Sequence, residues 1–415
     1  MLIFSSCKKT ENSLNSSEPK ASIVPIELAK QVAERFNDVK YLPNTDNLNK
    51  KSSATRNLLQ GNNKIKNQLT LNDKNGLPAI YIFNFENNAG FVFISADYNL
   101  RPILAYIQNG EFDGNKMPEG FEDWINRTKE NTEVVRDGKF DNKIAGALAW
   151  RNYFKEYGVD TTILAGKPMP IDPDPNPCDN PPPPVSYMKG PLLPVTWGQS
   201  CSYNDLCALG TTFNCTNLGC GTGRPLTGCV ATSMAQVMRY NQFPATYNYA
   251  TMPATAGNNA VQALMRDAGN SVSMQYGCNG SGAYVQDVVP ALKNVFGYSS
   301  ANCWSYSNTS YNQGYGRVKD NINNYNLPVI LAGSDNAAGG HQWVCDGTLS
   351  TTYFFGNCGT GNSSASYLSF HMNWGWHEQN IATDYNGWFA FDNWTIYGLN
   401  YNFQYSKYGI TEIHP

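Results

Sequence analysis

The sequence predicts an α+β protein made of two units of different character, joined by a proline-rich segment. Charge is the first observation: residues 1–189 hold 23 Lys and Arg and 23 Asp and Glu, whereas residues 190–415 hold 7 and 10. The second is the run Lys167–Pro184, which contains nine prolines. The third is the order of patterns in the second half, where helices come first and short strands follow, as in α+β domains.

These observations divide the 415 residues into four parts. We expect a tether at 1–21, a first unit at 22–165, a linker at 166–192 and a second unit at 193–415. The length allows two or three domains. The net charge of −3 gives no indication of a nucleic-acid partner. No run of 18 apolar residues is present, so the sequence predicts no membrane-spanning segment.

The first ten residues, MLIFSSCKKT, resemble the end of a bacterial lipoprotein signal. In such signals the cysteine, here Cys7, becomes the lipidated first residue of the mature protein. Six preceding residues are too few for a full signal, so the alternative is a chance cysteine in a disordered end. Residues 11–21 are polar and predict a tether.

The first unit has the pattern of a small α+β domain with an antiparallel sheet. It contains no His and no Cys, and therefore no cluster of catalytic residue types. The apolar spacing predicts helices at Ile26–Phe36, Phe121–Arg136 and Ile144–Tyr157, and strands at Ala79–Phe85, Gly90–Ala96 and Pro102–Ile107.

The linker favours extended polyproline II and cannot form a core. We expect a protease-accessible spacer; a proline-rich ligand for a partner domain is the alternative.

A helix that begins near Cys229 dominates the second unit. Val230, Met234, Val237 and Met238 fall at i, i+4, i+7 and i+8, which is one buried helix face. Gly228 interrupts the chain just before it, so Cys229 lies in the first turn. Unpaired N–H groups and the helix dipole stabilise a thiolate there, which can lower a thiol pKa from ~8.5 to ~3.5–7.5. Two interpretations remain open at this point: a reactive nucleophile or a buried structural cysteine.

The rest of the second unit changes from helices to strands. Further helices are predicted at Val261–Asp267 and Val285–Phe296, and strands at Pro328–Ala332, His341–Asp346, Tyr353–Gly356, Tyr367–Asn373 and Gly387–Phe391.

A nucleophilic cysteine needs a base within hydrogen-bond reach and a group that orients the base. Four histidines are available, His341, His371, His377 and His414. His341 follows two glycines, which allow close approach of a substrate backbone, and opens an apolar strand. We favour His341 as the base over His371, and expect the other to be a hydrogen-bonded core histidine.

Nine of the 11 cysteines lie between Cys201 and Cys358. The eight besides Cys229 form an even set, which predicts disulfides in an exported protein. A pair between Cys345 and Cys358 is the preferred single guess among 105 connectivities. A zinc site is disfavoured, because no cysteine pair has CxxC spacing and histidines are few. We therefore predict no metal and no cofactor.

The second unit resembles streptopain and its relatives, a family of bacterial papain-like cysteine proteases. The matching runs cover most of residues 194–410 in the family's order: WGQSCSYN around 199–204, TGCVATSMAQVMRYNQFP at 227–244, LMRDAGNSVSMQYG at 264–277, ALKNVFGY at 291–298, GGHQWVCDG at 339–347 and MNWGW at 372–376. The run YIFNFENNAGFVFISADYNLRPILAY, followed by PEGFEDWI, makes the first unit resemble the family's propeptide. The resemblance implies a papain-like catalytic domain behind a small α+β prodomain.

The resemblance also implies residue roles. Cys229 matches the nucleophile and His341 the general base and acid. Gln199 matches the oxyanion-hole side chain, Asn373 the residue that orients the imidazole, and Trp374 the ring that shields that contact. Gly282 and Gly340 match positions whose backbone holds the substrate. Two departures concern substrate preference: His377-Glu378 with a longer loop replaces a Gly-rich turn, and Gln342-Trp343 replaces the usual pair after the histidine.

The function implied is a cysteine endopeptidase made as a zymogen, which hydrolyses protein or peptide substrates through an acyl-enzyme. Its own prodomain would be its intramolecular inhibitor. We expect it in the extracellular space or the cell envelope, at the periplasm or outer surface, with a membrane link only through lipid at Cys7. Two alternatives are a transglutaminase-like acyltransferase and a catalytically inactive lipoprotein that binds peptides or glycans.

Overall fold

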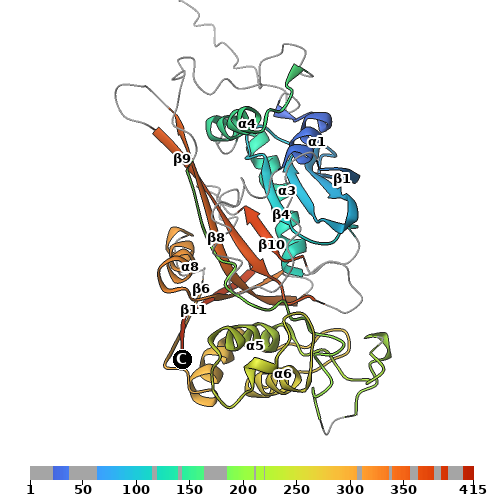
Figure 1. The fold of residues 1–415 in the computed structure, drawn as a ribbon, viewed down its shortest axis with the longest axis vertical. Coiled ribbons are helices and arrows are strands. Elements are labelled where there is room, and N and C mark those ends of the chain that lie inside the picture. Colours follow the sequence, from blue (N-terminus) through green and yellow to red (C-terminus); the bar gives the residue numbers. More distant parts are fainter. Residues whose placement is uncertain are drawn as a thin grey trace, which may run out of the picture.

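The computed structural model describes residues 22–36, 63–114, 119–138, 143–162, 185–209, 212–218, 220–305, 311–335, 339–355, 363–377, 385–390 and 405–415. Over these ranges one antiparallel sheet runs through both units, in the strand order β1-β2-β3-β4-β10-β9-β8-β7-β11-β6, with β5 paired to β8 (Figure 1). Within the same ranges, no helix combines the length and the apolar content needed to cross a bilayer.

The N-terminal unit places helices on both faces of its part of the sheet. Ile80 and Ile82 pack on the side of α3, whereas Tyr81 and Phe83 pack on the side of α1 and α4, as the two-residue period of a strand requires. Its elements are α1 (Ile26–Arg35), β1 (Ile65–Asn72), β2 (Pro78–Phe85), η3 (Glu86–Asn88), β3 (Phe91–Ser95), β4 (Ile103–Ile107), α3 (Glu119–Arg136) and α4 (Lys143–Tyr157).

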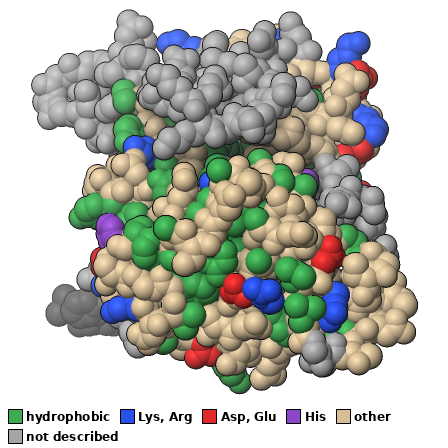
Figure 2. Space-filling model, turned by 60° about the horizontal axis from the view of Figure 1, so that its bottom comes forward, with side chains coloured by type: hydrophobic (Ala, Val, Ile, Leu, Met, Phe, Trp, Pro, Cys, Tyr) green, Lys and Arg blue, Asp and Glu red, His purple; other side chains and the backbone are tan. Residues whose placement is uncertain are grey.

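The C-terminal unit has a helical part, at the lower end of Figure 1, and the remaining strands. Its helices and turns are η5 (Thr216–Leu218), α5 (Cys229–Asn241), η6 (Tyr249–Thr251), α6 (Asn259–Ser271), η7 (Val285–Asp287), α7 (Val288–Pro290), η8 (Ala291–Val295) and α8 (Tyr311–Tyr325). Its strands are β5 (Val185–Lys189), β6 (Ser300–Ser305), β7 (Val329–Asp335), β8 (Gly339–Phe355), β9 (Ser363–Asn373), β10 (Gly387–Ala390) and β11 (Tyr405–His414). The face turned forward in Figure 2, near α5 and α6, carries only scattered charged side chains.

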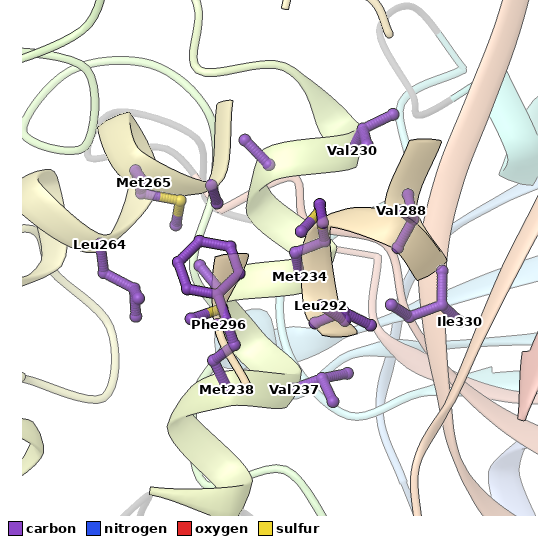
Figure 3. Close-up of a cluster of buried hydrophobic side chains, with 14 of the residues drawn as sticks. Val230, Met234, Val237, Met238, Leu264, Met265, Val288, Leu292, Phe296 and Ile330 are labelled. Carbon is purple, nitrogen blue, oxygen red and sulfur yellow. The ribbon is translucent and has the colours of Figure 1, made fainter. Parts of the chain in front are cut away.

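Helix α5 is the centre of the helical core. Val230, Met234, Val237 and Met238 are all at most 4% exposed, as the helical spacing predicts. They point toward side chains of α6, of the turns at 288–296 and of β7 (Figure 3). This packing fixes the helix and therefore fixes the position of its first residue, Cys229.

The two units share one sheet. Strand β4 of the N-terminal unit pairs with β10 of the C-terminal unit, with Tyr106 opposite Trp388. An aromatic cluster covers the junction: the Trp124 and Phe389 rings lie 5.1 Å apart, and the Phe121 and Trp374 rings 6.2 Å apart. Pairing satisfies the backbone groups that two exposed edge strands would leave open.

The linker prediction is wrong at its C-terminal end. Residues 185–189 form β5, an edge strand that pairs with Thr348–Thr352 of β8. Leu192 and Leu193 then donate backbone hydrogen bonds to Asp346. The proline run itself lies outside the described residues, which resume at Val185, the first residue of β5. The ordered C-terminal unit therefore begins by Val185, not near 193.

One further local prediction holds in outline and one is wrong. The segment predicted as a helix at 285–296 is helical over 285–295, but its hydrogen bonding changes along it, from the 3-10 turn η7 through α7 to the π-helix η8. Strands predicted at 341–346 and 353–356 are one 17-residue strand, β8, because Asp346 lies in a bulge where the register against β9 shifts between Cys345 and Gly347.

Disulfides are present, but the preferred pair is wrong. Cys201 is bonded to Cys220 and Cys215 to Cys278. Cys345 is a buried thiol outside any disulfide, and burial raises its pKa well above the ordinary value. Strand β8 runs ten residues beyond Cys345, which at about 3.3 Å per residue carries the chain far outside the 7 Å limit for a bridge. Cys358 lies outside the described residues.

Candidate active site

Cys229 is the first residue of α5 and is half-buried. Gly228 precedes it with φ +88° and supplies no side-chain cap to the first turn. A Cβ at Gly228 would lie 2.7 Å from the Met274 sulfur and 2.9 Å from the Ser281 carbonyl oxygen. Only glycine fits this conformation and this space, so the glycine places the thiol at the start of the helix.

We predict that Gly228→Ala destabilises the protein by about 2–4 kcal/mol, since it adds positive-φ strain to a close backbone contact. Gly280→Ala is the matched control, because a Cβ there meets nothing within 4 Å and the cost should stay below about 1 kcal/mol. Urea unfolding midpoints, measured in a Cys229→Ala background to prevent self-cleavage, compare the two. Equal midpoints would show that Gly228 is not required.

Gln199 lies beside the segment that leads into Cys229. Its carbonyl accepts a 2.9 Å hydrogen bond from the Thr227 N–H. Its side-chain Nε2 donates to the Gly375 carbonyl at 3.4 Å, a long bond that a stronger acceptor can replace. Gly198 has no room for a Cβ because the His377 backbone crosses it. The structure thus brings the Gln199 stretch, the Cys229 segment and the turn after β9 together.

His341 lies on β8 opposite Gly333 of β7 and is 6% exposed. Its Nε2 is 2.9 Å from the Trp374 carbonyl oxygen. A carbonyl can only accept, so Nε2 carries the proton and the neutral ring leaves Nδ1 as its basic nitrogen. The Trp343 ring is nearly parallel to the imidazole at 6.0 Å, and the Trp376 ring is at 6.3 Å.

Burial lowers the pKa of His341 to about 4, against a smaller raising effect of the bond to the Trp374 carbonyl. The imidazole is therefore neutral at pH 7 in the full-length chain. Exposing the ring to water would remove the main cause of this shift and return the pKa toward the ordinary value near 6.5.

This shift predicts that acid destabilises the full-length chain. The pKa is lower when folded than when unfolded, so the stabilising contribution is complete above pH 6.5 and is lost as pH falls through 4. The loss attributable to His341 should be about 3 kcal/mol between pH 7 and pH 4. Urea unfolding of Cys229→Ala measures it, with Cys229→Ala/His341→Gln as control. Equal pH dependence in both proteins would contradict the assignment.

Two glutamines connect α5 to its surroundings: Gln342, which the sequence analysis links only to substrate preference, and Gln236, which it does not single out. Gln342, next to His341, donates to the Ser233 hydroxyl at 2.8 Å, and this hydroxyl lies 2.9 Å from the Cys229 carbonyl oxygen. Gln236, two turns after Cys229, donates to the Trp197 carbonyl at 2.9 Å. A glutamine on a buried helix face is the signal that could have identified Gln236, since buried polar groups need partners.

Asn373 does not contact His341 in this structure. Its Oδ1 accepts from Gln236 at 3.1 Å and from the Gly375 N–H at 3.3 Å, and its Nδ2 donates to the Val195 carbonyl at 2.8 Å. The carbonyl of Trp374 takes the position against the imidazole instead. Asn373 therefore fixes the turn that carries this carbonyl, and the 1%-exposed Trp374 ring packs 5.1 Å from Trp343.

None of the other three histidines has a hydrogen bond that links it to α5 among the described contacts. His371 Nδ1 is 2.6 Å from an Asp346 oxygen, and the other oxygen of that 1%-exposed carboxylate accepts from the Leu193 N–H. His371 is thus part of the junction between β8, β9 and the segment after β5. His414 is exposed at the end of β11, and His377 is placed by its backbone against Gly198.

The two glycines predicted to hold substrate differ in availability. Gly282 is exposed, but its N–H and carbonyl already bond to Gln275 at 3.1 and 2.9 Å. Only its carbonyl, which has a second lone pair, could bind substrate. Gly340 is exposed and pairs with Ser334 of β7 on one side; among the described strands, β9 pairs with β8 only from Val344 onward. Cys7 lies outside the described residues.

Each unit matches the profile of a known family. The sequence profile of the Peptidase C10 family matches residues 197–250 and 245–389. The profile of the Spi protease inhibitor family matches residues 21–132.

Individual relatives align with most of this chain. Thiol protease/hemagglutinin PrtT of Porphyromonas gingivalis is 27% identical over 341 residues, which cover 71% of this chain and 32% of PrtT. Streptopain of Streptococcus pyogenes is 24% identical over 337 residues, covering 72% of this chain and 71% of streptopain. This chain thus spans about a third of PrtT. A Prevotella intermedia prointerpain A fragment shares the fold, with a TM-score of 0.53 and 23% identity over 84% of this chain and 99% of the fragment.

Proposed function

Because the chain belongs to the peptidase C10 family, that of streptopain, and carries a Spi-type inhibitor segment ahead of its catalytic part, we propose that it is a cysteine endopeptidase made as a zymogen. One observation carries the proposal most: Cys229 begins a helix buried in the core, and Ser233 and Gln342 tie its first turn to the strand of His341. A thiol so placed can act as a nucleophile next to a base held by the fold.

The chemistry we propose starts from the Cys229 thiolate and the His341 imidazolium. The thiolate attacks the carbonyl carbon of a peptide bond. The Cys229 N–H and the Gln199 amide stabilise the oxyanion, and one such donor is typically worth ~2.7–4 kcal/mol. His341 then gives its proton to the leaving amine, and water hydrolyses the acyl-enzyme with His341 as base. The Trp374 carbonyl holds Nε2–H, so that Nδ1 is the atom that exchanges the proton.

We propose that the N-terminal unit silences the enzyme by holding the histidine neutral. Phe121 of α3 packs on the ring of Trp374. The backbone carbonyl of the same residue accepts the hydrogen bond from the buried His341. A neutral imidazole cannot form the thiolate–imidazolium pair. Removing α3 would uncover the aromatic cluster around Trp374 and hydrate this region, which supports activation by loss of the prodomain.

The shared sheet predicts that cutting the linker alone does not release the prodomain. A site-specific protease site placed within 173–177 of the Cys229→Ala chain should, once cut, give two fragments that co-elute in size-exclusion chromatography at micromolar concentration. The β4–β10 ladder and the aromatic cluster hold them together. Trp124→Ala should weaken this association by about 3 kcal/mol, since it empties a buried site. Separation of the unmutated fragments would contradict the prediction.

The position of β5 also restricts where activation can cut. A cut within or beyond β5 would remove strand residues that pair with β8, so we place the activating cleavage before Val185.

We further propose export to the cell envelope or the extracellular space, with lipid attachment at Cys7. The two disulfides support an oxidising compartment.

Incubation of the full-length protein with casein tests the proposed function, with mass spectrometry of both the substrate and the chain. Endopeptidase activity gives internal casein fragments and self-processing. Adding a labelled primary amine separates the alternatives: amide products in place of hydrolysis would indicate an acyltransferase, and an unchanged substrate would indicate a binding protein.

A further inference from the structure

The segment that delivers Cys229 runs between two loops, and both loops are covalently anchored to the same short stretch of chain. The first loop, 199–204, binds the segment through the Gln199 carbonyl, which accepts from Thr227, and through Asn204, whose amide donates to the Pro225 carbonyl at 3.0 Å. We call it the oxyanion loop, because it carries Gln199.

The second loop, 277–282, binds the opposite side of the same segment. The Ser281 hydroxyl donates to the Leu226 carbonyl at 2.7 Å, and the Leu226 N–H donates to the Gly277 carbonyl at 3.4 Å. We call it the substrate loop, because it carries Gly282.

Each loop contains one cysteine that forms a disulfide with a cysteine of residues 215–220. Cys201, in the oxyanion loop, is bonded to Cys220, and Cys278, in the substrate loop, is bonded to Cys215. The turn η5 separates the two anchoring cysteines by only a few residues, and the Leu218 N–H donates to the Cys215 carbonyl within it. The cysteine-rich stretch therefore fixes the spacing of the two loops across Leu226–Gly228.

Neither loop belongs to a helix or a named strand. The oxyanion loop has one turn, in which the Tyr203 and Asn204 N–H groups donate to the Ser200 carbonyl, and the substrate loop has one β-bridge, between Gly282 and Gln275. The substrate loop contains Asn279 and two exposed glycines, Gly280 and Gly282, so its ordering costs much conformational entropy. The bridge between Gly282 and Gln275, one backbone bond to Leu226 and the bonds of Ser281 leave such a loop at the low-stability end of a protein. A covalent anchor at Cys278 removes much of this freedom.

We propose that the two disulfides are positioning elements with separate effects on catalysis: Cys215–Cys278 holds the substrate loop and sets substrate binding, whereas Cys201–Cys220 holds the oxyanion loop and sets the rate of acyl transfer. This inference rests on the proposed peptidase function. When only a fraction of loops is binding-competent, the apparent dissociation constant rises by the inverse of that fraction. A misplaced oxyanion donor instead lowers kcat.

The test uses the full-length protein after self-processing, assayed on a peptide substrate. Cys215→Ser/Cys278→Ser should raise KM about tenfold and change kcat less than about threefold. Cys201→Ser/Cys220→Ser should lower kcat about tenfold or more with little change in KM. Cys303→Ser, which removes an exposed thiol outside any disulfide, is the control and should match the wild type. Equal effects of the two double variants on both parameters would overturn the proposal.

Two further measurements keep the test valid if a double variant is poorly folded or if the protein is not a peptidase. Ser281→Ala breaks the link to Leu226 without touching a cysteine and should raise KM in the same direction, by a smaller factor. Hydrogen exchange of Cys229→Ala chains needs no activity. It should show faster exchange of residues 275–282 only in Cys215→Ser/Cys278→Ser, and of residues 199–204 only in Cys201→Ser/Cys220→Ser. Protection unchanged in both would overturn the proposal irrespective of function.

Discussion

Replacing Cys229 by alanine is expected to abolish peptide-bond hydrolysis and to leave the full-length chain unprocessed. The thiolate is the atom that bonds to the substrate carbonyl, and no other group can replace it, so the loss in kcat/KM should be on the order of 10⁴-fold or more. Gly228 and the buried face of α5 stay unchanged, so the fold should persist. Intact mass spectrometry follows processing, and a quenched peptide follows hydrolysis.

Cys303→Ala is the matched control, because it removes another thiol that no disulfide uses. It should retain wild-type processing. Normal self-cleavage by purified Cys229→Ala, free of other proteases, would assign the nucleophile elsewhere.

Replacing His341 by alanine should remove essentially all acyl transfer, whereas His371→Ala should retain most of it. His341 is the histidine whose strand is bonded to the first turn of α5 through Gln342 and Ser233. His371 instead hydrogen-bonds through Nδ1 to the carboxylate of Asp346, which is 1% exposed. Its removal takes a hydrogen-bond partner from a buried carboxylate and should cost about 1–3 kcal/mol of stability.

Rates per folded enzyme at 25 °C, together with unfolding midpoints, distinguish the two effects. The prediction requires a rate loss with little destabilisation for His341→Ala, and the opposite for His371→Ala. Loss of acyl transfer in folded His371→Ala, with activity retained in His341→Ala, would reverse the assignment.

The helix that begins at Cys229 could be predicted because residues close together in the sequence determine its start and its buried face. Val230, Met234, Val237 and Met238 mark one face, and Gly228 marks the start. The same reasoning located β2, β3, β4, α3 and α4 to within a few residues.

Pairings between distant segments could not be predicted in this way. Strands β4 and β10 are 280 residues apart, and each is five residues or shorter, so no local pattern links them. The sequence predicts two strands in place of β8, because Asp346-Gly347 has the composition of a turn. A Cβ at Gly347 would meet the His371 and Trp388 side chains, so packing against β9 and β10 requires this glycine.

The site shows the same division. Sequence motifs predict roles for Cys229, Gln199 and His341, and the fold brings the segments that carry them together. Which group contacts the imidazole depends on the turn after β9, where Asn373 is used by Gln236 and Val195 and the Trp374 carbonyl faces the ring. The presence of asparagine at position 373 does not reveal that the backbone carbonyl of the next residue, Trp374, makes the hydrogen bond to His341.

The most direct test of the central claim is to map where a peptidyl epoxide, which alkylates reactive thiolates, modifies the protein before and after processing. We expect stoichiometric labelling at Cys229 in the processed wild type. We expect little labelling in the full-length chain, where His341 is neutral and buried, and little in His341→Ala chains that the wild-type enzyme has processed in trans. Equal labelling of Cys229 before and after loss of the N-terminal unit, or labelling at Cys207 or Cys303 in its place, would contradict the account.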